Sequence, residues 1–454
     1  MKVAIIGGGL TGLALAERLR KPGRSLKVFE RSSRIGGLAT WHDYGQFSWD
    51  RFYHVILPSD RHLIGFIRDI GLGNALRWKR TLTGFYVDRE FHSMSSGLDF
   101  LRFPPVSPIG KLRLAFTILY CAQLRDWRPL EQIPVDEWLR RMCGQQTYDK
   151  IWRPLLLAKL GEHYHRVSAV FIWSYIKRMF SARDPSTAKE QLGYVTGGYK
   201  TVLQRIARRF NDSGDQILTN VTVHRIEAAD RGGLNVHYDN GVEHFDRVVF
   251  TAPVSALRAV AAEELCMLSQ SDEADVEYLG VICAAVITRL PLVPYYVVNI
   301  ADSQIPFTGI IGMSNLIASD QTDGLHITYL PKYVHSDDPL LRAPNEDLRA
   351  MFVEGLRTMF PWLQSRHIVD LHINRAVKVQ PLQVLGYSRL VPTVTTAHPD
   401  FFVVNTSQFA ANTLNNNDVI RCVDEFVRTH QQSFEVKRGP ETQLPFLQRT
   451  EQVL

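Results

Sequence analysis

The sequence opens with a strand, a glycine turn and a helix inside its first twenty residues, and this pattern constrains the fold most. Residues 2–6 are mostly β-branched, as in a buried strand, and residues 10–19 carry apolar side chains at helical spacing. Gly7, Gly9 and Gly12 fall at and just after the turn between them. Such a turn lets the backbone approach a pyrophosphate, and the helix N-terminus offers free N–H groups to the anion. The pattern predicts a dinucleotide-binding unit.

An acidic residue stands at the end of the next predicted strand. Residues 26–29 are mostly apolar and lead directly into Glu30. A carboxylate at this place in a βαβ unit accepts hydrogen bonds from the ribose hydroxyls of an adenosine. The alternative is a solvated carboxylate at a strand end. The glycine spacing before it favours the nucleotide interpretation.

Length and composition bound the remaining possibilities. A chain of 454 residues favours two or three lobes, and 45% apolar with 22% charged residues is typical of globular proteins. The net charge of +6 suits anionic ligands or a membrane surface, but no nucleic-acid-binding motif accompanies it. Five scattered cysteines form no C-x-x-C, and no apolar stretch is long enough to span a bilayer. We expect a cytoplasmic protein without a metal site.

A second glycine pair, Gly36 and Gly37, lies in the segment RSSRIGGLATW. Together with the N-terminal glycine pattern it resembles the flavin superfamily of amine oxidases, protoporphyrinogen oxidase, phytoene desaturases and UDP-galactopyranose mutase. The resemblance implies FAD as cofactor and places this second loop at the flavin pyrophosphate. Relatives usually carry arginine after the Gly-Gly, whereas this chain has Leu38. A charged phosphate contact is therefore either missing or supplied by Arg31 or Arg34.

Residues 47–60, FSWDRFYHVILPSD, resemble the family's Asp-x-Gly-x-His segment. Asp50 and His54 stand at matching places, and Phe52 replaces the usual glycine. The resemblance implies that this loop lies against the isoalloxazine ring, with His54 near its N5/O4 edge. An imidazole there can donate a hydrogen bond or shuttle a proton. A histidine that only packs in the turn is an equally weighted alternative.

The following residues, 61–189, are expected to be mainly helical. Their most distinctive part, residues 148–183, combines aromatic side chains with basic ones that include Arg153, Lys159, His163, His165, Arg166, Lys177, Arg178 and Arg183. One interpretation is a helix pair with a solvated basic face. The other is a cationic mouth for an anionic or lipid-phosphate substrate, with peripheral membrane contact.

Later segments resemble further parts of the same family. Gly197 and Gly198 precede a predicted helix, and an Asn-Gly pair at 240–241 predicts a hairpin. The resemblance implies that the backbone around Val223 receives the adenine and that the turn of Thr251, Ala252 and Pro253 closes behind the cofactor. Residues 262–395 alternate in strands of a largely antiparallel sheet, the expected substrate floor. Candidates to face its cavity are Asn315, His326, Tyr329 and Tyr387.

The last element is a strand over residues 401–404, followed by a loop and a helix near Asp418. In the family this region binds the ribityl chain and the flavin pyrimidine, and the helix N-terminus stabilises negative charge at N1 and O2. Relatives usually place Gly-Asp or Gly-Glu after the strand. Here Asn405 and the asparagines at 415–417 stand instead, so these contacts are expected to be modified.

The resemblance covers nearly the whole chain and predicts an α/β protein with a Rossmann-like FAD-binding domain and a discontinuous substrate domain. The expected divisions are 1–60, 190–261 and 396–435 for FAD; 61–189 for a helical insertion; 262–395 for the substrate sheet; and 436–454 for a tail. The predicted FAD contacts are Gly7, Gly9, Leu10, Thr11, Gly12, Glu30, Arg31, Gly36, Gly37, Leu38, Asp50, Val223, Thr251, Ala252, Pro253, Asn405, Thr406, Asn417, Asp418 and Val419.

The predicted activity is FAD-dependent removal of a hydride from a C–N or C–C unit of a small or lipid-like substrate, with His54 as the catalytic candidate. One alternative keeps the flavin for a mutase or isomerase acting on a nucleotide sugar or related anion. Another is a non-catalytic binding protein, because Rab GDP-dissociation inhibitors resemble this fold; the intact glycines and Glu30 oppose it. The substrate, the electron acceptor and the oligomeric state are left open.

Overall fold

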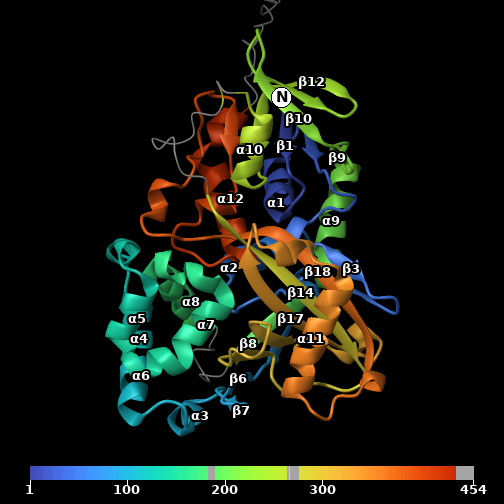
Figure 1. The fold of residues 1–454 in the computed structure, drawn as a ribbon. Helices are drawn as coiled ribbons and strands as arrows, with labels where there is room; N and C mark the ends of the chain where they lie inside the picture. The colour runs from blue at the N-terminus through green and yellow to red at the C-terminus, as the bar shows by residue number, and fades with distance from the viewer. Residues whose placement is uncertain (182–189, 263–264, 266–275, 436–454) are drawn as a thin grey trace, which may run out of the picture.

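A five-stranded parallel sheet forms one half of the molecule (Figure 1). The computed structural model describes residues 1–181, 190–262, 265 and 276–435. The strand order is β19-β13-β1-β2-β9, and all four pairings are parallel. Its strands come from distant parts of the chain: β1 (Lys2–Ile6), β2 (Ser25–Phe29), β9 (Gln216–Leu218), β13 (Arg247–Phe250) and β19 (Phe401–Val403). Their carboxyl ends therefore meet at one edge, where such sheets bind ligands.

Both faces of this sheet are covered. On β1, Val3 and Ile5 join a core with helices, whereas Ala4 and Ile6 face a second core beneath a small antiparallel sheet. The helices are α1 (Leu10–Leu19), α2 (Arg61–Asp69), α9 (Gly198–Ser213) and α12 (Asn416–Thr429). The small sheet comprises β10 (Val223–Ala228), β11 (Leu234–Tyr238) and β12 (Gly241–Phe245), with α10 (Val254–Val260) beside it. Tyr238 pairs with Gly241, which confirms the predicted Asn-Gly hairpin.

A seven-stranded sheet forms the other half, in the order β18-β14-β17-β16-β15-β6-β7. Every pairing is antiparallel except that of β15 with β6. The strands are β6 (Thr83–Val87), β7 (Glu90–Ser93), β14 (Tyr278–Thr288), β15 (Val297–Ile300), β16 (Gly309–Gly312), β17 (His326–His335) and β18 (Ile368–Pro381). Two further ribbons pair β3 (Trp41–Asp43) with β4 (Ser48–Asp50), and β5 (Leu76–Arg80) with β8 (Gln191–Val195).

Strand β14, the second from one edge of this sheet, is buried along its whole length, because both of its faces are packed. Ile282 and Val286 belong to the core beneath helix α11 (Asn345–Met359). Cys283 and Ile287 point the other way and pack with aromatic residues of the 44–57 segment. The period of two along a strand thus places this segment on the face of the sheet opposite α11.

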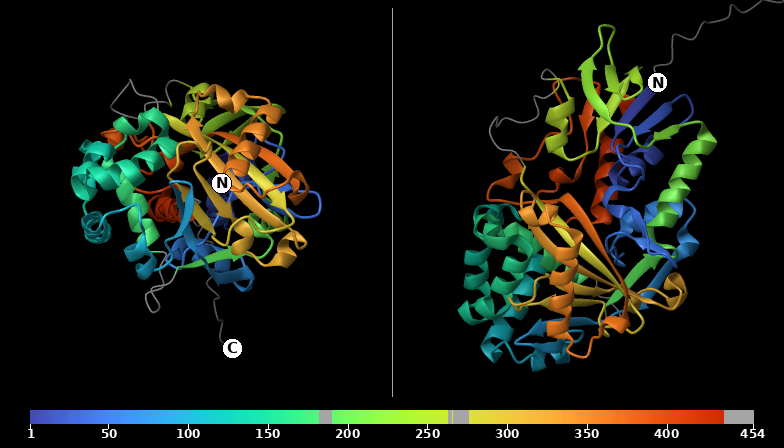
Figure 2. Two further views of the ribbon diagram at one scale, coloured as in Figure 1. Left: turned by 60° about the horizontal axis from the view of Figure 1, so that its bottom comes forward. Right: turned by 45° about the vertical axis from the view of Figure 1, so that its right-hand side comes forward.

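A group of helices lies to one side of the seven-stranded sheet, as both views of Figure 2 show. It comprises α3 (Gly97–Arg102), α4 (Pro108–Gln123), α5 (Val135–Cys143), α6 (Gln145–Thr147), α7 (Arg153–Leu160) and α8 (Ala169–Ser181). The mainly helical character expected for residues 61–189 therefore applies to α2 and to the part from residue 97 onward. Residues 76–93 form strands instead, because β6 and β7 complete the edge of the larger sheet.

Candidate functional site

The turn between β1 and α1 combines two tightly packed glycines with an open one. A Cβ atom on Gly12 would lie 2.0 Å from the carbonyl oxygen of Gly7, and one on Gly7 would lie 2.7 Å from Thr251 Oγ1. A Cβ on Gly9 would meet nothing within 4 Å. Gly9 is also the N-cap of α1, and no side chain caps that helix end. The open space at an uncapped helix N-terminus fits a pyrophosphate group.

Glu30 lies directly beside this turn. Its Oε2 atom accepts a hydrogen bond from the backbone N–H of Gly8 at 2.8 Å, and its Oε1 atom accepts one from Ser32 at 2.7 Å. The side chain remains partly accessible. Each carboxylate oxygen can accept a second hydrogen bond, so the geometry suits the predicted ribose contact. Val223, the predicted adenine contact, begins β10 close by, because the backbone of Val221 donates to Glu30 O.

The second glycine loop packs against the first. The backbone N–H of Gly36 donates to Gly8 O at 2.7 Å, and a Cβ on Gly37 would lie 3.2 Å from Gly9 Cα. Both Gly36 and Gly37 have positive φ angles, of 107° and 56°, which favour glycine. The structure therefore brings together the two loops that the sequence assigns to the pyrophosphate.

Three residues around the second loop, Arg31, Arg34 and Leu38, differ in their surroundings. Leu38 packs against the apolar core of the 44–57 segment. Arg34 donates to Trp41 O and lies over the Trp41 ring, 5.5 Å from its centroid. Arg31 is exposed. Of the two arginines proposed to replace the family's phosphate contact, Arg34 is thus engaged elsewhere.

Asp50 and His54 lie together in the 47–60 segment, as the sequence predicts for a site loop. The Asp50 carboxylate accepts a hydrogen bond from Tyr199 N at 2.7 Å, and its Oδ2 atom is 3.7 Å from His54 Nδ1. The His54 ring lies 4.9 Å from the Tyr199 ring. The His54 Nδ1 atom is buried without a hydrogen-bond partner in the described part of the chain.

Two more buried polar atoms nearby lack partners among the described residues. Thr40 Oγ1 follows the second glycine loop, and Trp49 Nε1 precedes Asp50. Buried polar atoms are nearly always hydrogen-bonded in folded proteins, so these two atoms are available to hydrogen-bond a ligand or a water. Sequence reasoning did not select Thr40 or Trp49; their places beside Gly37 and Asp50 were the only available signal.

The carboxyl ends of β1, β13 and β19 are tied together by side chains predicted at the site. Thr251 Oγ1 lies within hydrogen-bond distance of the carbonyl oxygens of Ile6 and Gly7, at 3.0 and 3.1 Å. Asn405 Nδ2 donates to Ala252 O at 3.0 Å, and Asn405 Oδ1 caps the short helix that begins at Thr406. These residues fix the strand ends, and Pro253 caps α10 behind them.

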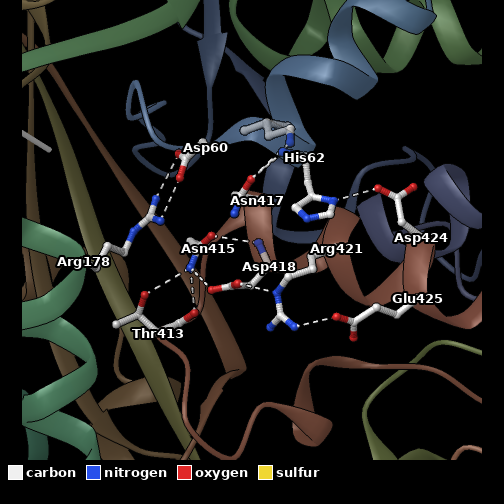
Figure 3. A network of polar contacts seen from close by, with 11 residues as sticks. Asp60, His62, Arg178, Thr413, Asn415, Asn417, Asp418, Arg421, Asp424 and Glu425 are labelled. Carbon is white, nitrogen blue, oxygen red and sulfur yellow. Dashed lines mark hydrogen bonds and ion pairs between the residues drawn. The ribbon is translucent and has the colours of Figure 1, made fainter. Parts of the chain in front are cut away.

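Side chains at the start of α12 are largely engaged with protein groups (Figure 3). Asn417 Oδ1 accepts hydrogen bonds from His62 N and Leu63 N, at 3.0 and 3.2 Å, and so caps α2. The Asp418 carboxylate is held by Asn415 Nδ2 and Arg421 Nε, at 2.6 and 3.1 Å. The Asn417 side-chain oxygen and the Asp418 carboxylate are therefore both engaged with protein donors. Leu10 and Val419 are buried in the core, and Thr11 is partly accessible.

The four residues predicted to face the substrate cavity have different surroundings in the structure. Asn315 Nδ2 donates to two backbone carbonyls, and Tyr387 donates to Ser407 O, so both are structural. Tyr329 donates to Asp50 O and thereby contacts the site loop. His326 is partly accessible, and burial lowers its pKa.

Comparison with known proteins assigns the family. The model of the flavin containing amine oxidoreductases matches residues 10–402. The chain belongs to this family. Its members use a flavin, so FAD is the cofactor and the protein is a flavin-dependent oxidoreductase. No described helix is long and apolar enough to cross a membrane, and the described residues contain no cluster of potential metal ligands.

The relatives are distant in sequence and close in fold. The chain is 32% identical over 100 residues to the flavin-dependent L-tryptophan oxidase RebO of Lentzea aerocolonigenes, covering 21% of each protein. It is 25% identical over 268 residues to the chloroplastic protoporphyrinogen oxidase of Nicotiana tabacum, covering 52% of this chain and 47% of that protein. The chain thus matches at most about half the length of these two relatives.

Two solved structures match along almost the whole chain. A putative protoporphyrinogen oxidase from Exiguobacterium superposes with a TM-score of 0.73 at 17% identity, covering 95% of this chain and 98% of that one. Reduced UDP-galactopyranose mutase superposes with a TM-score of 0.71 at 16% identity, covering 96% and 94%. At these identities the likeness shows the fold alone.

Proposed function

We propose that this protein oxidises a small or lipid-like substrate by removing a hydride from a C–N or C–C unit. The observation that carries the proposal is the open space at Gly9, where the uncapped start of α1, the second glycine loop and the Glu30 carboxylate converge. Bound there, FAD supplies the hydride acceptor. Family membership supports the same chemistry.

The residues of this chain would bind and orient the reactants. Gly9 and Gly37 would let the backbone approach the pyrophosphate, and Glu30 would hold the ribose. Asp50 would fix the loop that carries His54, whose Nδ1 atom is free of protein hydrogen bonds in the described structure. His54 would then donate a hydrogen bond or move a proton at the reactive edge of the ring.

Two observations keep a flavin-dependent mutase or isomerase as the second candidate. The fold matches reduced UDP-galactopyranose mutase, and a partly accessible lysine, Lys159, which lies over the Tyr333 ring, suits an anionic substrate. A non-catalytic role receives less support, because the turn glycines and Glu30 keep the geometry of a nucleotide site.

Anaerobic spectroscopy of the purified yellow protein tests these functions. Bleaching of the flavin by an amine, a porphyrinogen or a polyene would support substrate oxidation. Turnover of a sugar nucleotide only after chemical reduction, without net loss of electrons, would favour the mutase. Protein that binds no FAD even when reconstituted would contradict both enzymatic proposals.

We also propose peripheral membrane contact through helix α4. The buried face of α4 carries Gly110, Thr117 and Cys121, whereas its exposed face is the more apolar one. That face comprises Ile109 (71% exposed), Leu112 (73%), Phe116 (62%) and Leu119 (52%). Residues 100–125 include four basic side chains and no acidic one. An apolar helix face with flanking positive charge suits the surface of an anionic bilayer.

Vesicle co-sedimentation tests this contact. The wild type should pellet with phosphatidylcholine vesicles containing phosphatidylglycerol, and less with pure phosphatidylcholine. The double variant Leu112→Asp, Phe116→Asp should stay in solution. Leu290→Asp, at an exposed leucine outside α4, is the matched control. Wild-type protein that does not pellet with either kind of vesicle would contradict the membrane proposal. Wild-type dimers that the same double variant abolishes would contradict it too, because the face would then be a dimer interface.

A further inference from the structure

The basic residues of the helical insertion differ in how their charges are neutralised. Arg166 makes two hydrogen bonds to the Glu277 carboxylate, at 2.9 and 2.8 Å. Arg178 makes two to Asp60, at 2.9 and 3.1 Å. His165 lies 3.1 Å from Asp136, and Arg183 lies outside the described residues. These carboxylates neutralise Arg166 and Arg178, two of the positive charges that the sequence places in this segment.

Lys159 is different because it turns inward without an acidic partner. Its Nζ atom lies 3.0 Å from the centroid of the Tyr333 ring and 6.0 Å from that of Tyr175. No carboxylate in the described part of the chain forms an ion pair with it, and burial lowers its pKa well below the ordinary lysine value. A cation–π contact offsets only part of the cost of burying an ammonium group.

Three parts of the chain hold Lys159 in this position. A π-helical turn (Tyr148–Trp152) leads directly into α7. At the end of α7, Thr308 Oγ1 donates to Ala158 O at 2.8 Å, which ties the helix to the substrate sheet. The Tyr333 ring comes from β17, and Tyr175 from α8.

The phenols around Lys159 offer hydrogen-bond donors. The hydroxyls of Tyr53 and Tyr333 are 2.8 Å apart, so one donates to the other and the accepting hydroxyl keeps its own proton free. Tyr175 donates to Gln380 Oε1 at 3.3 Å. Burial raises the pKa of Tyr53 and Tyr333 and raises that of Tyr175 to about 12, so all three phenols stay protonated near neutral pH. We call these four residues, Lys159, Tyr53, Tyr175 and Tyr333, the Lys159 cluster.

The Lys159 cluster adjoins the proposed flavin loop. Tyr53 directly precedes His54, and its ring lies 6.2 Å from that of Tyr329. Tyr329 and Tyr333 are four residues apart on β17 and so lie on the same face of the sheet. Tyr329 also donates to Asp50 O. All four side chains of the cluster keep some accessible surface, although the fold desolvates them.

We propose that the Lys159 cluster binds an anionic group of the substrate, a carboxylate or a phosphate. The ligand supplies the counter-charge that the described residues do not, and the free phenol proton of the Tyr53–Tyr333 pair donates to a second oxygen. Bringing an anion to a desolvated amine also favours the protonated lysine, because opposite charges stabilise each other in a medium of low dielectric constant. This inference rests on the proposed function and narrows its substrate class.

The inference also separates this chain from a relative in fold. Putrescine oxidase, solved with putrescine bound, superposes with a TM-score of 0.69 at 15% identity. A diammonium substrate placed at the Lys159 cluster would find an amine and no carboxylate among the described residues, whereas an acidic substrate would find an amine that can be protonated and phenol donors. We therefore expect an acidic substrate rather than a simple diamine.

Titration of the FAD-loaded protein with small aromatic probes tests the proposal. Benzoate carries a carboxylate, phenyl phosphate carries a phosphate, and benzamide is the neutral analogue of benzoate. The readouts are the change in the flavin absorption spectrum and the heat of binding. The wild type should bind at least one anion, and benzamide more weakly. The stronger anion identifies the group that the cluster prefers.

Variants then assign the binding to Lys159. In Lys159→Met the dissociation constant of the bound anion should rise by about tenfold or more, while benzamide binding should not change. Lys159→Arg should retain part of the affinity. The control is Lys177→Met, because Lys177 also lies over an aromatic ring, 4.6 Å from that of Trp173, but is exposed.

Each outcome bears on the proposal separately from FAD binding. If Lys159→Met does not fold, the second variant is the double substitution Tyr53→Phe, Tyr333→Phe, because it removes both phenol protons of the pair and should weaken anion binding severalfold. Wild type that retains FAD but binds none of the anions, or a Lys159→Met protein with unchanged anion affinity, would overturn this inference alone. Loss of FAD from the wild type would instead count against the proposed function.

Discussion

The carboxylate of Asp50 accepts a hydrogen bond from the backbone N–H of Tyr199 at 2.7 Å, although the two residues are 149 positions apart. A Cβ on Gly198, which precedes Tyr199, would lie 2.7 Å from Asp50 Oδ1. The Asp50 carbonyl oxygen accepts the hydroxyls of Tyr44 and Tyr329. Asp50 thus joins its own loop to the 197–198 glycine turn and to β17. We expect it to hold these three segments in position around the site.

Replacing Asp50 should therefore lower the stability of the fold. Asp50→Ala leaves the buried N–H of Tyr199 unpaired and should lower the free energy of unfolding by about 2 kcal/mol or more. Asp50→Asn keeps the acceptor oxygen and should cost less. Chemical denaturation measures both, with Asp43→Ala in the exposed part of β3 as the control. Equal stability of the two alanine variants would contradict this role.

Gly9 and Gly12 should respond to substitution in opposite ways. Gly9 has an ordinary φ of −70° and free space around it, so Gly9→Val should fold but lose FAD, because its methyl groups occupy the predicted pyrophosphate position. Gly12→Ala places a Cβ 2.0 Å from a backbone oxygen and should destabilise the fold itself. Flavin content after gel filtration, together with melting curves, distinguishes the two. A yellow, stable Gly9→Val protein would remove the pyrophosphate from this turn.

Glu30 should matter for affinity more than for chemistry. Glu30→Ala removes the proposed ribose contact and the acceptor for Gly8 N, and it should weaken FAD binding by on the order of 2 to 4 kcal/mol. Glu30→Gln keeps one acceptor oxygen and should lose less. Equilibrium titration of the apoprotein with FAD measures both constants. Unchanged affinity in the alanine variant would show that Glu30 serves only the turn.

The sequence predicted the mixed fold and the family because its signals are local. The strand, glycine and helix of residues 2–19 lie together in the chain, and so do the strand and acid at 26–30. Strands β6 and β7 form a local hairpin in which Val87 pairs with Glu90, and its place in the sheet depends on a remote partner: β6 pairs in parallel with β15, more than 200 residues later. Their short apolar segments resemble those of helices and turns until that pairing is known. The domain boundaries themselves stay a prediction.

Site residues could be predicted only where their spacing along the sequence relates them to a strand or a helix. Glycines and Glu30 have fixed places relative to a strand and a helix, whereas the direction of a side chain on a packed helix depends on tertiary contacts. Lys159 and Lys177 are both basic residues of the helical insertion, yet Lys159 points inward at Tyr333 and Lys177 is exposed. The side chain of Asn417 likewise serves α2, which no local pattern indicates.

His54 should affect flavin reduction without affecting flavin retention. Its Nδ1 atom is buried, makes no hydrogen bond within the described structure and lies 3.7 Å from Asp50 Oδ2. If His54 moves a proton or donates to the ring, His54→Ala should slow the reductive half-reaction by roughly 100-fold. Stopped-flow reduction measures the rate, with His42→Ala in β3 as the control. A normal rate with a lowered melting temperature would assign His54 to packing.

The buried amine of Lys159 should make the stability of the ligand-free protein depend on pH. Burial lowers the pKa of Lys159 well below its ordinary value, whereas an unfolded chain releases this proton at about pH 10.4. Between the two pKa values the unfolded state binds more protons, so the free energy of unfolding rises with pH. The free-energy cost of burying the charged amine is complete below the pKa of Lys159 in the folded protein. It disappears as the pH approaches the pKa of Lys159 in the unfolded chain.

Lys159→Met removes this cost and should be more stable than the wild type near neutral pH. The difference in the free energy of unfolding should shrink as the pH rises from 7 to about 10. The groups facing Lys159 are Tyr53, Tyr175 and Tyr333, and their raised pKa values keep them neutral over this range. Urea denaturation at several pH values measures the difference, with Lys177→Met expected to give a small and constant one. The contrary result is a Lys159→Met protein that is less stable than the wild type by the same amount at every pH. It would show that burying the Lys159 amine has no pH-dependent free-energy cost and that the side chain only packs.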